Sequence, residues 1–149
     1  MLSQLEQVSA NLAAARALRA EGVPYRVIGR RLALTTSQLG HIRRTLKREK
    51  AGQTRLHRTM PGATARDFPV GRSALPAGLR GILTRAGYRT LGDLADRIAD
   101  RDQPGLETMP GLGPVRIRLV RALLDEFGLR AGSSDLQAEI EALFPDLRD

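Results

Sequence analysis

The stretch that decides the fold is residues 25–46, YRVIGRRLALTTSQLGHIRRTL. Its apolar side chains have the spacing expected of two helices that cross steeply over a tight turn and share a core. They are Ile28, Leu32, Leu34, Leu39 and Ile42. Gly29 falls where the two helices come closest, Ala33 begins the turn, and the hydroxyl of Thr35 or Thr36 is placed to cap the second helix. This pattern predicts a helix-turn-helix unit.

The second helix of this unit has polar side chains between its apolar positions. If it enters the major groove of DNA, those side chains face the base edges. The expected base-reading residues are Thr36, Ser37, Gln38, His41 and Arg44. Basic side chains around them would hold phosphates and set the register without reading sequence. The expected phosphate contacts are Arg30, Arg31, Arg43, Lys47 and Arg48.

Residues 18–46, LRAEGVPYRVIGRRLALTTSQLGHIRRTL, resemble the DNA-binding domain of the Hin-type invertases and resolvases. The resemblance covers only a three-helix domain, so the serine recombination chemistry of that family is not implied. It places Ser37 and His41 at the family's base-reading positions. His41 stands where the invertase has an arginine, which changes the base that this position would prefer.

Charge is distributed unevenly along the chain. The 149 residues carry a formal net charge of +8. Residues 1–74 hold 14 basic and 4 acidic side chains, a net of +10, and residues 75–149 hold 10 basic and 12 acidic ones, a net of −2. A basic half beside a near-neutral half favours a polyanion partner for the first half.

Hydrophobic periodicity predicts an all-α protein made of two small modules on a tether. Residues 1–50 form a three-helix module whose first helix runs over 4–21 and ends at Gly22. Residues 51–74 have scattered apolar side chains and several Gly and Pro residues, which predicts a basic flexible linker. Residues 75–130 form a second helical module, and residues 131–149 contain a capped, acidic amphipathic helix.

The second module contains a helix-hairpin-helix pattern. The turn Met109-Pro110-Gly111-Leu112-Gly113 precedes an amphipathic helix, PVRIRLVRALLDEF. Its glycines allow a tight turn whose backbone N–H groups can hold a phosphate. The expected phosphate-binding residues are Gly111, Gly113 and Arg116. A weaker unit of the same kind, residues 75–96, precedes it.

Residues 75–129 resemble the C-terminal domain of the bacterial RNA polymerase alpha subunit, most clearly in AGYRTLGDL at 86–94 and PGLGPVRIRLVRALLDEFGL at 110–129. The resemblance implies binding in an AT-rich minor groove and contact with activators and sigma factor. In this chain Gly78 replaces the family's groove-inserting arginine, and Gly81 replaces a nearby asparagine. The lysine and serine after the hairpin become Val115 and Arg116. Contact with DNA and contact with a protein are therefore both left open for this module.

Several function classes are disfavoured. The chain has no cysteine, which excludes disulfides, thiol chemistry and Cys-ligated zinc. His41 lacks a second metal ligand at suitable spacing, and Asp93 is expected near a helix N-terminus rather than in a metal pair with Asp96. We therefore expect no catalysis, no cofactor, no metal and no membrane segment.

The sequence favours a cytoplasmic, nucleoid-associated transcription regulator of bacterial or phage type that binds double-stranded promoter DNA. RNA polymerase or another transcription factor is the expected protein partner. Two alternatives stay open: a sequence-independent architectural or recombination-accessory protein, and an adaptor that binds RNA polymerase. A homodimer also stays open.

Overall fold

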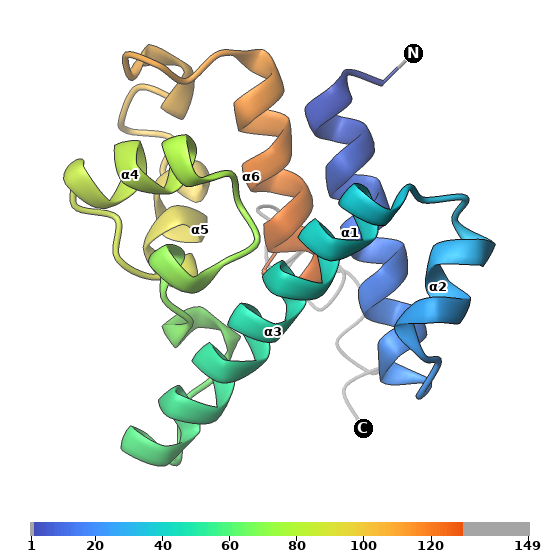
Figure 1. Ribbon diagram of the computed structural model, residues 1–149. Coiled ribbons are helices and arrows are strands. Elements are labelled where there is room, and N and C mark those ends of the chain that lie inside the picture. Colours follow the sequence, from blue (N-terminus) through green and yellow to red (C-terminus); the bar gives the residue numbers. More distant parts are fainter. Residues whose placement is uncertain (1, 130–149) are drawn as a thin grey trace, which may run out of the picture.

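The computed structural model describes residues 2–129, and that part of the chain is helical (Figure 1). Its α-helices are α1 (Gln4–Ala20), α2 (Tyr25–Arg31), α3 (Thr36–Thr59), α4 (Ala77–Arg85), α5 (Leu91–Ala99) and α6 (Pro114–Glu126). Short 3-10 turns cover Ala65–Asp67, Val70–Arg72 and Leu106–Thr108. Within the described residues the only β-type pairing is one isolated bridge, between Pro69 and Thr90. The all-α prediction is confirmed for this range, and the helix expected within 131–149 lies outside it.

Helix α1 has clear start and stop signals. The Ser3 hydroxyl accepts a hydrogen bond from the backbone N–H of Glu6 and caps the first turn. The helix ends before Gly22, whose φ is +86°, and the N–H of Val23 then donates to the carbonyl of Leu18. The expected stop at Gly22 is confirmed. Helices α1, α2 and α3 share one apolar core, made of Leu12, Ala15, Ile28, Ile42 and Leu46.

The connection between α2 and α3 is tight. Ala33 adopts a left-handed φ of +53°, which lets the chain turn within a few residues. Thr35 caps α3: its hydroxyl accepts from the N–H of Gln38, and the Gln38 side chain accepts from the N–H of Thr35. A Cβ built on Gly29 would lie 2.9 Å from a Leu39 methyl, so the close approach expected at Gly29 is confirmed.

The flexible linker expected over residues 51–74 is contradicted by the structure. Helix α3 continues to Thr59, so the first part of this segment is helical. Gly52, which looked like a helix breaker, is buried, and its Cβ position is 3.2 Å from the Phe68 ring. Having no side chain, Gly52 lets the returning chain pack directly on α3. A tertiary contact thus stabilises a turn of helix that local sequence disfavours.

The rest of the same segment belongs to the second core. Phe68 and Val70 are fully buried, and the Phe68 ring stacks on Phe127 with centroids 5.7 Å apart. Ser73 is buried as well, and its hydroxyl donates to the carbonyl of Val70. Helices α1–α3 form one half of the described chain, and α4–α6 form the other. Residues 60–74 therefore pack the two halves together instead of forming a loose tether.

Helices α4, α5 and α6 pack around this second core, whose buried members include Leu79, Leu83, Leu94, Leu119 and Leu124. Gly87 turns the chain between α4 and α5 with a φ of +98°. The Thr90 hydroxyl accepts from the N–H of Asp93, and the Asp93 carboxylate accepts from the N–H groups of Thr90 and Arg89. Asp93 thus lies at the N-terminus of α5, as the sequence predicted.

These hydrogen bonds give Asp93 a pH-dependent role. The backbone N–H of Thr90, followed by that of Arg89, stabilises the carboxylate and lowers the pKa of Asp93. Because this pKa is lower in the folded state, Asp93 stabilises the fold above its unfolded pKa, about 3.9, and loses this effect as the pH falls through the folded pKa. Asp93→Asn is expected to lower the free energy of unfolding at pH 7 by less than about 1 kcal/mol, since the site is exposed.

Urea unfolding at neutral pH and in acid measures this effect. The stability difference between Asp93→Asn and the parent chain should shrink below pH ~4. Gln103→Ala, at an exposed turn and without an ionisable side chain, is the control and should show no such dependence. A difference that stays constant with pH contradicts the role given to Asp93.

A buried ion pair links α1 to α3, and its arginine also reaches the second half of the molecule. Arg16 on α1 donates from two guanidinium nitrogens to the two carboxylate oxygens of Glu49 on α3, both at 2.8 Å. It also reaches Glu126 on α6 at 3.2 Å and lies over the Phe127 ring, 5.6 Å from its centroid. Helix α1 packs alongside α6 in Figure 1. The expectation of two tethered modules is replaced by two packed ones.

Candidate nucleic-acid interface on helix α3

Helix α3 presents a long basic face to solvent. Its 24 residues extend over about 36 Å. It carries seven arginine and lysine side chains: Arg43, Arg44, Lys47, Arg48, Lys50, Arg55 and Arg58. Its one acidic residue, Glu49, is only 5% exposed and points inward to Arg16. The positive charge of the outer face is therefore not offset by any carboxylate of the same helix.

The C-terminal half of α3 contributes a part of this face that sequence reasoning missed. Exposed Lys47, Lys50, Arg55 and Arg58 line one shallow hollow along the helix, together with Ala51 and Thr54. We call Lys47, Lys50, Arg55 and Arg58 the basic ridge. The sequence placed Arg55 and Arg58 in a linker, so their common helical face was not visible. Their spacing of three residues was the available signal.

The five predicted base-reading residues are all exposed, but they differ in what they contact. Thr36 and Ser37 lie in the first turn of α3. The side-chain oxygen of Gln38 is already engaged in the cap with Thr35. His41 lines a cavity between the two halves of the chain. Arg44 lies along α3, its guanidinium 3.2 Å from the Cβ position of Gly40.

The predicted phosphate-contacting residues form two groups. Arg30, Arg31, Arg43 and Lys47 are exposed. Arg30 and Arg43 line the hollow where α2 and α3 cross. Arg26, which was not among the predicted phosphate contacts, lines it as well. The guanidinium of Arg43 also lies over the Tyr25 ring, 5.7 Å from its centroid.

Arg48 lies on a different side of α3. One of its guanidinium nitrogens donates to the carbonyl of Ser73 at 2.8 Å, and its Nε is buried. Burial and the neighbouring charge of Arg80 lower the pKa of Arg48. Arg48 therefore belongs to the junction between the halves and not to the outer basic face.

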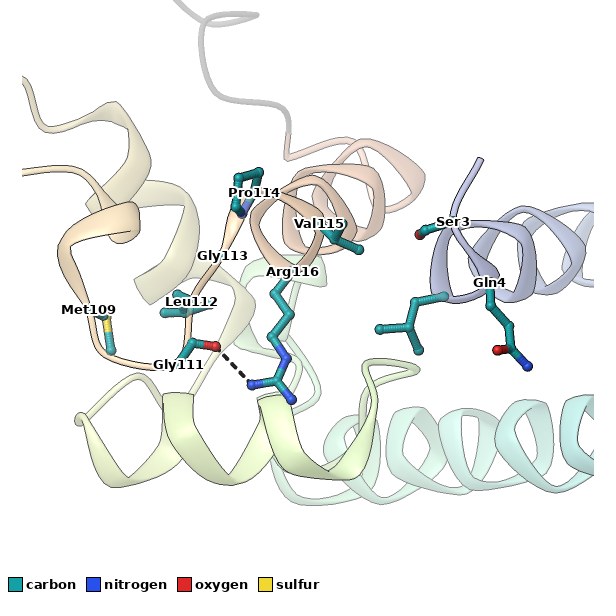
Figure 2. A pocket seen from close by; sticks show the side chains of 10 residues that line it. Ser3, Gln4, Met109, Gly111, Leu112, Gly113, Pro114, Val115 and Arg116 are labelled. Carbon is teal, nitrogen blue, oxygen red and sulfur yellow. Dashed lines mark hydrogen bonds between the residues drawn. The ribbon is translucent and has the colours of Figure 1, made fainter. Parts of the chain in front are cut away.

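The predicted hairpin residues lie together at the start of α6. Gly111 has a φ of +86°, and Gly113 is the N-cap of α6. Arg116 folds back over the turn and donates to the carbonyl of Gly111 at 2.8 Å, as the dashed line in Figure 2 marks. The hollow beside this turn also borders Leu5 and the start of α1. Arg116 thus stabilises the turn.

Two glycines stand where the resemblance expected DNA-binding side chains in the second half. Gly78 on α4 is exposed, and Gly81 is half-buried. Arg80, next to the expected arginine position, donates to the carbonyls of Leu75 and Gly71. These hydrogen bonds hold the segment before α4 in place, so the guanidinium of Arg80 is not an outward-facing free cation.

Within residues 2–129, no group of three or more His, Cys, Asp or Glu side chains is arranged to hold a metal ion. Asp96 pairs with Arg66 at 2.8 Å. No helix in this range combines the length and the apolar character that crossing a bilayer requires.

Comparison of the chain with protein-family models, curated proteins and solved structures found no match.

Proposed function

We propose that the protein is a DNA-binding transcription regulator in which α2 and α3 form a helix-turn-helix and α3 enters the major groove. The observation that carries this proposal is the outer face of α3, where basic side chains are exposed while Glu49 is buried in a pair with Arg16. A basic stripe along one helix is the electrostatic signature of a nucleic-acid-binding protein. The chemistry of the face supports phosphate contacts along several turns of α3.

In this proposal the N-terminal turn of α3 reads bases and the rest of the helix positions it. Thr36, Ser37 and Arg44 are exposed and have donors or acceptors available for base edges. Arg26, Arg30 and the basic ridge would hold the backbone on either side. The second half of the molecule, with its helix-hairpin-helix, would contribute an auxiliary contact to DNA or to RNA polymerase.

One observation favours a second candidate, a sequence-independent DNA-binding protein. Gln38 is used as a cap, and His41, although exposed, borders the cavity between the two halves, so two of the five predicted base-reading side chains do not simply face outward. A helix with few base contacts and many phosphate contacts binds with little sequence preference.

Selection from random duplexes, followed by sequencing and gel-shift competition, distinguishes the two candidates. We expect an enriched motif and an affinity that falls steeply with salt. Ser37→Ala should relax the preference at one base position, costing about 1–3 kcal/mol for the preferred base. His41→Ala should have a smaller effect, because His41 lies toward the cavity. Binding without an enriched motif supports the second candidate, and absence of DNA binding refutes both.

A further inference from the structure

A cavity of about 590 Å³ lies between the two halves of the molecule. Its walls come from α1, from the first part of α3, from residues 74–77 and from α6. We call it the central cavity. Its volume is within the range of sites that bind small organic molecules, about 300–1,000 Å³.

One side of the central cavity is apolar. Its aliphatic wall residues are Leu2, Leu5, Val8, Leu12, Leu119 and Leu123. Leu2 and Leu5 are 55% and 41% exposed, and they are two of the three large hydrophobic side chains that the described residues leave exposed. Leu12, Leu119 and Leu123 are also packed in the two cores, whereas the exposed side chains of Leu2 and Leu5 would be removed from water by an apolar ligand.

The other side carries positive charge without a carboxylate partner. Arg48 donates to the carbonyl of Ser73, and Arg80 donates to the carbonyls of Leu75 and Gly71, so neither bond neutralises a charge. The Nε of Arg48 is buried and has no hydrogen-bond partner within residues 2–129. A buried donor in that state costs free energy until an acceptor reaches it.

The remaining cations of the cavity are already paired. Arg16 is held by Glu49 and Glu126, and Arg118 is paired with Glu6. Arg48 and Arg80 therefore have no ion-pair partner of their own, and their mutual repulsion, offset only in part by the nearby charge of Glu49, raises the cost of holding them together. An anion placed beside the two guanidinium groups would relieve this repulsion.

We propose that the central cavity binds a small amphipathic carboxylate, with its carboxylate on Arg48 and Arg80 and its apolar body on the leucines of α1 and α6. The apolar wall and the cationic end lie in one cavity, which matches a ligand with one charged end. His41 and Thr45 of α3 also line the cavity, so a bound ligand contacts the opposite side of the helix that carries the basic ridge. The binding itself does not depend on the DNA-binding proposal.

Isothermal titration calorimetry of the full chain with decanoate, in the absence of DNA, tests the proposal. We expect saturable one-to-one binding, at least tenfold tighter than that of decanol or decylamine, which lack the anion. Arg48→Gln should weaken decanoate binding at least tenfold, and Arg48→Lys should keep part of it. Ala13→Phe, which places a ring in the cavity wall, should abolish it. Arg85→Gln on the exposed end of α4 is the matched control and should leave it unchanged.

Circular dichroism of each variant confirms that it is folded before titration. Absence of decanoate binding to the parent chain overturns the proposal. Equal binding of decanoate and decanol overturns the role of the two arginines, and so does an Arg48→Gln variant that binds as the parent does. Loss of DNA binding in a separate assay has no bearing on these outcomes.

Discussion

Replacing Arg16 by alanine is expected to destabilise the protein by about 3–5 kcal/mol. The reason is the position of Glu49, whose side chain is only 6% exposed and whose two carboxylate oxygens both accept from Arg16. Without Arg16 this carboxylate is buried without a counter-ion. The same substitution removes the contact with Glu126 and the cation over the Phe127 ring, so it also weakens the contact between the two halves.

Urea unfolding followed by circular dichroism measures this loss. The matched control is Arg66→Ala, which breaks the pair with Asp96 between side chains that are 49% and 68% exposed, and it should lose far less stability. The double variant Arg16→Met, Glu49→Leu should regain most of the lost stability, since it leaves no unpaired charge. A loss below about 1 kcal/mol for Arg16→Ala would mean that the pair does not hold α1, α3 and α6 together.

Local signals predicted the start of the chain well. Gly22 ends α1, and Thr35 and Gly29 set the crossing of α2 and α3, because each acts through backbone groups within a few residues. A cap or a close approach of this kind is encoded in short sequence. The same holds for Asp93, which lies in the first turn of α5.

Two long-range contacts were not predictable in the same way. Gly52 lies in a helix because Phe68 packs against it, and Phe68 is sixteen residues away along the chain. Arg16 and Glu49 are 33 residues apart, and neither is distinguished from a solvated charge by its neighbours in sequence. Long-range contacts decide both cases, and they override local propensity.

For the candidate site, the sequence identified the right helix and only part of its face. Lys47 was expected to contact DNA, whereas Arg55 and Arg58 were assigned to a linker. Arg48 was grouped with Lys47 because both are cations on one segment. The structure separates them, with Lys47 on the exposed ridge and Arg48 bonded to Ser73. The packing of α3 decides which of its cations face solvent and which face the rest of the protein.

If the basic ridge holds DNA phosphates, neutralising it should have the largest effect on function of any surface change. The triple variant Lys47→Gln, Arg55→Gln, Arg58→Gln is expected to lower DNA affinity about 100-fold near physiological salt, at about 1 kcal/mol for each contact. The slope of log affinity against log salt should fall by about 3, since each lost cation releases one fewer counterion. The loss should be similar for all duplex sequences, because phosphates carry no base identity.

The matched control changes the same charge on the other half of the molecule. Arg85→Gln, Arg89→Gln, Arg121→Gln removes three exposed arginines and lowers the net charge equally. If the ridge itself holds DNA, the control keeps most of the affinity and nearly the full salt slope. If both triple variants lose affinity to the same extent, attraction comes from net charge and not from the ridge. If the ridge variant binds DNA as tightly as the parent, with an unchanged salt slope, the part of α3 after Arg44 does not belong to the DNA interface.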